Sequence, residues 1–200
     1  MIEVEKKFIL SQEDTNRLIN EAEFLGEIIF TDIYYDKKDF VLISKDKWLR
    51  RREDRFELKL PLNTGADRIA DQYEELTSEL EIKKALGFEI ENNLADALKE
   101  NGYLPFCVCK TTRKKYKKNH FNIDLNVVEF KEFTYSLGEI EIMVNQKSEI
   151  DQAVNEIMLF AQENNLKIGP VRGKVIEYLK RIKPGCYQVL AKVGVIKDFD

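Results

Sequence analysis

Acidic side chains of this protein recur at every second position in two short segments. Glu3 and Glu5 form one pair near the N-terminus, and Glu139 and Glu141 form another much later in the chain. Residues two apart on a β-strand project from the same face. Paired carboxylates suit a hard cation such as Mg²⁺, which takes oxygen ligands and usually keeps several waters beside substrate phosphates. The two pairs therefore indicate a metal-binding surface.

Basic side chains show the same spacing in other segments. Arg50 and Arg52 share one strand face, and Arg113 begins a basic alternation on another. A guanidinium group donates two parallel hydrogen bonds to a phosphate, which makes arginine well suited to phosphate recognition. Acids sorted onto some strands and bases onto others indicate a polyanion held between metal ions and cations. Arg51 points to the opposite face of its strand and is expected to be a surface charge.

The segments that must position these charges are predicted to be β-strands, because apolar and polar residues alternate in them. About eight strands, separated by polar or glycine-containing turns, are expected at 2–8, 28–35, 49–53, 55–60, 70–76, 106–117, 121–128 and 138–144. Helical periodicity predicts helices at 77–86, 94–101, 149–164, 174–183 and after Pro184. Another helix is expected to begin at Ser11, in a capping box with Asp14, and to end at Gly26.

Two architectures fit these alternating faces. In an ordinary antiparallel sheet, the apolar faces would cover a core and the charged faces would contact water. In a closed barrel of about eight strands, the charged faces would line a tunnel, and helices would cover the apolar outside. Solvated faces usually mix polar residue types, so the sorted charges favour the barrel. We therefore expect an α+β fold with a closed antiparallel β-barrel, built by a single domain over residues 1–200.

Composition excludes several classes of protein. The chain has 32 Lys+Arg against 36 Asp+Glu, and a net charge of −4 gives no sign of a nucleic-acid partner. Apolar runs fall far short of the roughly 18 to 20 residues that a membrane helix requires. The N-terminus lacks the pattern of a secretory signal. We therefore expect a cytoplasmic monomer, bound neither to a membrane nor to nucleic acid, that acts on a small molecule.

Cysteine and histidine are too few for several common kinds of site. Cys107, Cys109 and Cys186 are an odd number of cysteines in a chain without secretory features, and reduced, buried thiols are expected. His120 is the one histidine and is expected at the surface. A conventional zinc site and the Ser/His/Asp or Cys/His arrangements are therefore disfavoured.

Several short motifs follow one another in an order that resembles a known family. Glu3, Glu5 and Lys7 form the E-x-E-x-K signature of the CYTH superfamily, the triphosphate tunnel metalloenzymes. The later motifs are Tyr34-Tyr35-Asp36, residues 48–53, Glu57-Leu58-Lys59, residues 73–79, Thr111-Thr112-Arg113, Ile123-Asp124-Leu125, residues 138–141, and Lys174 with Tyr178, Leu179 and Arg181. As a set, across residues 2–190, they resemble the thiamine triphosphatase branch.

The resemblance implies roles for particular residues. It implies that Mg²⁺ is held by Glu3, Glu5, Asp124, Glu139 and Glu141. It implies that the triphosphate is bound by Lys7, Arg50, Arg52, Lys59, Arg113 and Lys174. Trp48 would lie beside the thiamine moiety, and Tyr34 with Lys59 would form a catalytic dyad. Asn126 stands where the family tends to have an aspartate, so this chain departs from the pattern there.

The expected reaction is Mg²⁺-dependent hydrolysis of thiamine triphosphate to thiamine diphosphate and phosphate. Water would attack the terminal phosphoryl group in line, while Arg50, Arg52 and Arg113 stabilise charge on its oxygens. Neighbouring cations would lower the pKa of Lys59 and let it act with Tyr34 in proton transfer. The alternative for Lys59 is a plain phosphate clamp.

Other activities remain open on the same tunnel. An inorganic tripolyphosphatase would hydrolyse triphosphate alone, and a class IV adenylyl cyclase would close ATP into a ring. A polyphosphate- or nucleotide-binding module without catalysis would keep the cations, yet it has no evident need for the sorted carboxylates. These alternatives differ in the product formed from each triphosphate.

Overall fold

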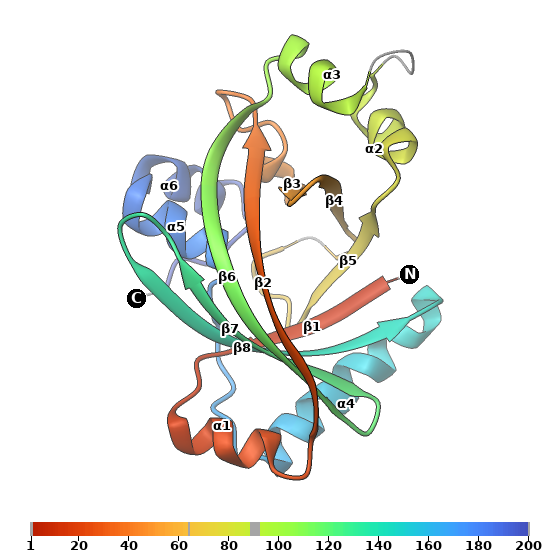
Figure 1. Ribbon diagram of the computed structural model, residues 1–200, viewed down its shortest axis with the longest axis vertical. Helices are drawn as coiled ribbons and strands as arrows, with labels where there is room; N and C mark the ends of the chain where they lie inside the picture. The colour runs from red at the N-terminus through yellow and green to blue at the C-terminus, as the bar shows by residue number, and fades with distance from the viewer. Residues whose placement is uncertain (1, 64, 89–92, 200) are drawn as a thin grey trace.

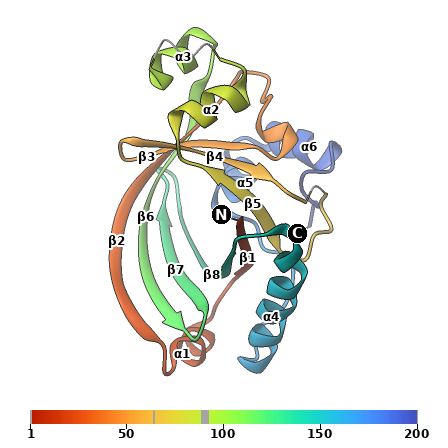
Figure 2. The ribbon, with the colours of Figure 1, turned by 90° about the vertical axis from the view of Figure 1, so that its right-hand side faces the viewer.

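The computed structural model describes residues 2–63, 65–88 and 93–199. Within this part of the chain, antiparallel strands close into a barrel in the order β1-β5-β4-β3-β2-β6-β7-β8 (Figures 1 and 2). The strands are β1 (Ile2–Phe8), β2 (Glu23–Asp36), β3 (Trp48–Arg52), β4 (Arg55–Pro61), β5 (Asp71–Leu76), β6 (Leu104–Lys118), β7 (Phe121–Glu129) and β8 (Thr134–Val144). The predicted closed barrel is confirmed.

Helices lie outside the barrel rather than within it (Figure 2). They are α1 (Gln12–Ile19), α2 (Glu79–Leu86), α3 (Leu94–Glu100), α4 (Ile150–Glu163), α5 (Lys174–Ile182) and α6 (Pro184–Lys192), with short 3-10 turns η1 (Ile43–Lys45) and η2 (Lys147–Glu149). Among the described residues, no helix is both long and apolar enough to cross a membrane.

The apolar faces of the strands pack against these helices. α4 contacts β1 and β8, and its Ile157 and Phe160 share one buried cluster with Val4 and Ile140 of those strands. Burying a side chain of this size stabilises the fold by roughly 1.5 to 3 kcal/mol. Since Val4 lies between Glu3 and Glu5, covering its side with α4 turns the two carboxylates toward the barrel interior.

Two further buried clusters repeat this arrangement elsewhere on the barrel. Ile82 of α2 lies in one cluster with Leu58 of β4, and α3 joins the same cluster. Leu179 of α5 lies in another with Val128 of β7, together with residues of α6. Because the apolar faces are covered from outside, the charged faces of the strands look inward.

Strand register brings the acidic pairs together. Between β1 and β8, Glu5 is opposite Glu141 and Lys7 is opposite Glu139. Directly opposed residues of an antiparallel pair project from the same face, with Cβ atoms about 4.5 to 5.5 Å apart. The two acidic pairs, separated by most of the chain, therefore meet on one inner wall.

On the other wall, β2, β3 and β4 bring together cations and aromatic residues. Tyr34 of β2 is opposite Arg50 of β3, and Trp48 of β3 is opposite Lys59 of β4. These pairs also share the inner face, which follows from the period of two along each strand.

One predicted helix boundary is wrong. The capping box of Ser11 and Asp14 is present, but α1 ends at Ile19, not at Gly26. The chain enters β2 at Glu23 and pairs with β6, with a register shift between Phe24 and Gly26. Gly26 has a φ of 131° in that bulge, a conformation that glycine adopts without a Cβ clash. Pairing with a distant strand therefore overrides the local helical pattern.

The remaining expectations for single residues are largely met. Cys107, Cys109 and Cys186 are buried free thiols. His120 is exposed, and its Nε2 lies 2.7 Å from a carboxylate oxygen of Glu156.

Candidate active site

A cavity of about 390 Å³ lies within the barrel, inside the range typical of small-molecule sites. Its walls contain almost every residue that the sequence predicted for the site, namely Glu3, Glu5, Lys7, Tyr34, Trp48, Arg50, Arg52, Lys59, Arg113, Glu139, Glu141 and Lys174. Asp124 is the exception among the predicted residues. It is fully buried behind the wall, next to Arg113.

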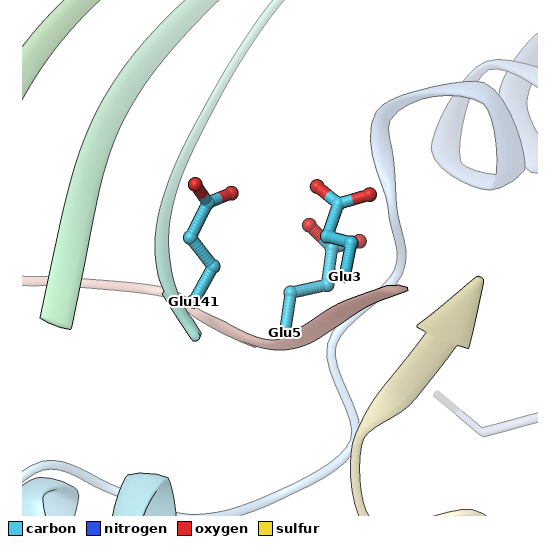
Figure 3. Close-up of side chains that lie close together, drawn as sticks. All are labelled: Glu3, Glu5 and Glu141. Carbon is cyan, nitrogen blue, oxygen red and sulfur yellow. The ribbon is translucent and has the colours of Figure 1, made fainter. Parts of the chain in front are cut away.

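Three carboxylates gather at one place in this cavity. Glu3 and Glu5 extend from β1, and Glu141 extends from β8 toward the same space (Figure 3). One oxygen atom from each lies within 4.8 Å of the others. Oxygen atoms from three carboxylates are a donor set that fits a hard divalent cation such as Mg²⁺.

Crowding of these carboxylates changes their acidity. Burial, followed by the charge of Glu3, raises the pKa of Glu5 to about 7 although Lys7 opposes the shift. Burial and the charges of Glu3 and Asp124 likewise raise the pKa of Glu141 to about 7. Carboxyl groups with raised pKa values keep protons near neutral pH unless a positive charge compensates. A divalent cation at the cluster would supply that charge.

Glu3 differs from its two neighbours because a lysine faces it. Burial alone would raise its pKa, but the charge and hydrogen bond of Lys59 lower the pKa of Glu3 to about 2. Lys59 donates this hydrogen bond through Nζ to Oε2 of Glu3. Glu3 is therefore ionised at neutral pH and connects the acidic cluster to the cations.

The predicted direction of the pKa shift of Lys59 is wrong. The sequence suggested that neighbouring cations lower its pKa. Burial and Arg50 do act in that direction, but the charges of Glu3 and Glu5 outweigh them and raise the pKa of Lys59. No hydrogen bond among the described residues joins Lys59 to Tyr34. Tyr34 lies on the opposite side of Arg50, and burial and Asp32 raise its pKa well above the usual range.

A carboxylate that sequence reasoning missed holds two of the cations. Asp32 of β2 is fully buried and accepts hydrogen bonds from Nε and NH2 of Arg52, at 2.9 and 3.2 Å. It also accepts one from Nζ of Lys174. Burial would raise the pKa of Asp32, but the charges of Lys174 and Arg50 hold it well below its usual range. Its place two residues before Tyr34 was the available signal.

Arg50 is held by a second group of carboxylates. Its Nε donates to Glu57 at 2.6 Å, and its NH2 donates to Glu75 at 3.1 Å. Both acids lie in the sequence motifs named above, which assign neither of them a role in the site. The guanidinium group of Arg50 is thus fixed in orientation on the inner wall.

Arg113 contacts the other two acidic residues that were predicted as metal ligands, Asp124 and Glu139. Its NH1 lies 2.5 Å from an oxygen of Asp124, and its NH2 donates to Glu139 at 2.9 Å. Its Nε donates to Asn126 at 2.6 Å. Among the described residues, neither Asp124 nor Glu139 joins the cluster formed by the other three carboxylates. Asn126, at which the chain departs from the family pattern, accepts a hydrogen bond from Arg113.

Trp48 lies at the cavity wall with a defined hydrogen bond. Its indole Nε1 donates to Oδ1 of Asp46 at 2.8 Å. Trp48 also packs against the cluster that contains residues of α5 and α6. Both a packing role and a substrate-facing role therefore apply to the same indole ring.

Comparison with known proteins identifies the family. A model of the CYTH domain matches residues 1–169. The thiamine-triphosphatase of Macaca fascicularis is 30% identical over 216 aligned positions, which cover 99% of this chain and 93% of that protein. The thiamine-triphosphatase of Homo sapiens is 29% identical with the same coverage.

Solved structures share the fold at lower identity. The PH1819 protein from Pyrococcus horikoshii OT3 has a TM-score of 0.64 and 22% identity, covering 90% of this chain and 99% of that one. HpAC1 from Hippeastrum, described as having a dominant triphosphatase activity, has a TM-score of 0.58 and 14% identity, covering 90% and 95%. By its match to the family model over most of its length, the chain belongs to the CYTH family.

Proposed function

We propose that this protein hydrolyses thiamine triphosphate to thiamine diphosphate and phosphate in a reaction that requires Mg²⁺. The observation that carries the proposal is the sorting of charge within one cavity. Three carboxylates converge on one side, and the predicted phosphate-binding cations line the same 390 Å³ space. The thiamine-triphosphatases at 29% and 30% identity, aligned over 99% of the chain, support the choice of substrate.

Glu3, Glu5 and Glu141 are the proposed metal ligands. These three residues would hold the ion, which when bound would supply positive charge beside the crowded carboxylates and the substrate phosphates. A metal role for Asp124 and Glu139 stays a prediction from the family resemblance. Their contacts with Arg113 favour a different contribution, in which they orient a guanidinium group toward the cavity.

The proposed phosphate ligands are the cations of the inner walls, namely Lys7, Arg50, Arg52, Lys59, Arg113 and Lys174. Their carboxylate partners orient them before substrate binds, so little side-chain entropy is lost when they contact phosphate. Charge-assisted hydrogen bonds from these groups would stabilise the oxygens of the terminal phosphoryl group as water attacks in line.

Lys59 is better suited to clamp phosphate than to accept a proton. The raised pKa that Glu3 and Glu5 give it keeps its ammonium group charged near neutral pH. The raised pKa of Tyr34 keeps a proton on the phenolic oxygen, where it can donate a hydrogen bond to a substrate oxygen. Water positioned by the cations of the inner walls would then be the nucleophile, and its proton would pass to a phosphate oxygen as the bond to the leaving diphosphate breaks.

Trp48 is the proposed contact for the organic part of the substrate. Thiamine carries a thiazolium cation and an aromatic pyrimidine, and an indole face attracts both by cation–π and stacking contacts of roughly 0.5 to 2 kcal/mol. Its cross-strand neighbour is Lys59, so an indole-bound ring would lie next to a phosphate clamp.

Phosphate release from three substrates tests the proposal. Thiamine triphosphate, ATP and inorganic triphosphate are each supplied with Mg²⁺ and with EDTA. We expect the highest kcat/KM for thiamine triphosphate, and no release in EDTA. Preference for inorganic triphosphate would favour a tripolyphosphatase, and formation of cyclic AMP from ATP would favour a cyclase. Absence of turnover on all three would favour a binding module.

A further inference from the structure

The hydrogen bond from Trp48 to Asp46 is the first link in a chain of buried contacts. Asp46 is 2% exposed and immediately follows η1, with a φ of 58° in the left-handed region. It does not line the cavity, whereas Trp48 does. The carboxylate therefore reaches the indole from behind the cavity wall, at a distance of 2.8 Å.

Two further donors fix the carboxylate of Asp46. The hydroxyl of Tyr73 donates to Oδ1 at 2.9 Å, and NH1 of Arg68 donates to Oδ2 at 2.7 Å. A buried carboxylate that accepts three hydrogen bonds has little freedom to rotate, since each rotation would leave a donor unpaired. Its contact with the indole nitrogen therefore restricts the plane of the Trp48 ring.

Arg68 extends this series of hydrogen bonds toward Lys7, one of the proposed phosphate ligands. Its Nε donates to Oδ1 of Asp71 at 2.6 Å, and the other oxygen of Asp71 accepts from Nζ of Lys7 at 2.5 Å. Its NH2 donates to the hydroxyl of Tyr73 at 3.1 Å. The guanidinium group thus joins the indole side of the cavity to a cation proposed to bind phosphate.

We propose that Asp46 and Arg68 are positioning residues that fix the indole of Trp48 for the organic part of the substrate. The proposal rests on the proposed function for its substrate, but the hydrogen-bonded chain is independent of that choice. Consecutive hydrogen bonds connect Trp48 to Lys7 through Asp46, Arg68 and Asp71. Selectivity for a triphosphate with an aromatic, cationic end then depends on Asp46, which lies behind the cavity wall, and on Arg68, which lines the cavity.

The first test measures the indole directly. Trp48 is the one tryptophan of the chain, so fluorescence excited at the long-wavelength edge of indole absorption, where the eight tyrosines absorb little, reports on this ring alone. In Asp46→Ala, we expect a shifted emission maximum and stronger quenching by acrylamide, because the ring loses its hydrogen bond and its restraint. Asp46→Asn keeps an oxygen that can accept from the indole, so its spectrum should return toward that of the wild type. Arg68→Met should show a smaller change than Asp46→Ala.

The second test compares two substrates. In Asp46→Ala, the ratio of KM for thiamine triphosphate to KM for inorganic triphosphate should rise by roughly two- to thirtyfold, the range expected from weakening the cation–π and stacking contacts of the indole with the organic part. Asp14→Ala is the matched control, because it removes a hydrogen-bonded carboxylate from the α1 capping box, outside the cavity. It should lower the Tm without changing the emission spectrum or the KM ratio.

Two outcomes would overturn the proposal. Wild-type fluorescence and quenching in both Asp46→Ala and Arg68→Met would show that these residues do not hold the ring. An unchanged KM ratio in variants with altered fluorescence would show that ring position does not set selectivity. If Asp46→Ala fails to fold, Arg68→Met carries both tests, with Asp46→Asn as the comparison that keeps the acceptor for the indole. If the wild type does not hydrolyse thiamine triphosphate, the proposed function fails. Fluorescence still decides whether the hydrogen bonds of Asp46 and Arg68 position Trp48.

Discussion

Lys174 at the first turn of α5 donates a hydrogen bond to Asp32 on β2, although 142 positions separate them in the sequence. The contact fixes the start of α5 at the cavity and places the ammonium group of Lys174 beside Arg52, which binds the same carboxylate. Burial lowers the pKa of Lys174 even though Asp32 opposes that shift. One buried acid thereby holds two cations proposed to bind the triphosphate.

Replacing Asp32 with asparagine should therefore reduce stability as well as activity. Arg52 and Lys174, which are half-buried, would lose their counter-charge, and the cost should approach but not exceed the value of about 3 to 5 kcal/mol that is typical of breaking a fully buried pair. Urea unfolding at neutral pH measures the loss. Asp39→Asn, an exposed aspartate on the loop after β2, is the control and should change the free energy of unfolding by less than about 0.5 kcal/mol. Equal values for both variants would contradict the assigned role of Asp32.

The arginines of β3 allow a comparison along one strand. Arg50→Ala and Arg52→Ala each remove a cavity-lining guanidinium group, and kcat/KM should fall roughly ten- to a hundredfold, or about 1.5 to 3 kcal/mol. Arg51 is absent from the cavity wall and lies half-buried on the outer face, so Arg51→Ala should change kcat/KM by less than about threefold. Steady-state kinetics on one substrate suffices, and similar losses from all three would invalidate the assignment of strand faces.

The role of Lys59 can be separated by two substitutions. An arginine cannot lose its proton at ordinary pH, but it can still bind phosphate. If Lys59 is a clamp, as its raised pKa indicates, Lys59→Arg should keep a substantial part of kcat while Lys59→Met loses it. Equal loss of kcat in both variants, with normal melting curves, would instead support a base.

The acidic cluster predicts an unusual dependence of stability on pH. The pKa values of Glu5 and Glu141 are raised from 4.5 to about 7, so the folded protein holds these protons more tightly than the unfolded chain does. In EDTA, their contribution is fully present below a pH of about 4.5 and is lost as the pH rises through about 7. Mg²⁺ binds the ionised carboxylates, so it should raise the Tm more at a pH of about 8 than at about 5.

Melting curves with EDTA or Mg²⁺ across this pH range test the prediction. Glu141→Gln removes one of the two titrating groups and should flatten the decline in EDTA. A gain in Tm from Mg²⁺ that is the same at both ends of the range would mean that these carboxylates do not bind the metal.

The barrel could be predicted from the sequence because the period of a strand fixes which side chains share a face. Once Val4 is assigned to the apolar side, Glu3 and Glu5 must lie on the other. The period of a strand does not say which residues contact one another across the barrel. The contact of Lys59 with Glu3 joins residues 56 positions apart, and it reverses the direction of the pKa shift that local reasoning gave Lys59.

The same limit explains the other differences between sequence and structure. Asp124 and Glu139 look like metal ligands by residue type, and only the pairing of β6, β7 and β8 brings the guanidinium group of Arg113 into contact with both. The expected end of α1 is wrong because β2 already begins at Glu23, where it pairs with β6. Non-local pairing, which no local pattern encodes, decides each of these cases.

Dependence of thiamine triphosphate hydrolysis on Mg²⁺ tests the central claim most directly. Phosphate release is measured against Mg²⁺ concentration for the wild type, Glu3→Gln and Glu141→Gln, with Arg51→Ala as a control outside the cavity. We predict no release in EDTA, a saturating rise with Mg²⁺ in the wild type and the control, and a higher Mg²⁺ requirement in both glutamine variants. Full activity in EDTA, or the same requirement in all four proteins, would contradict the account.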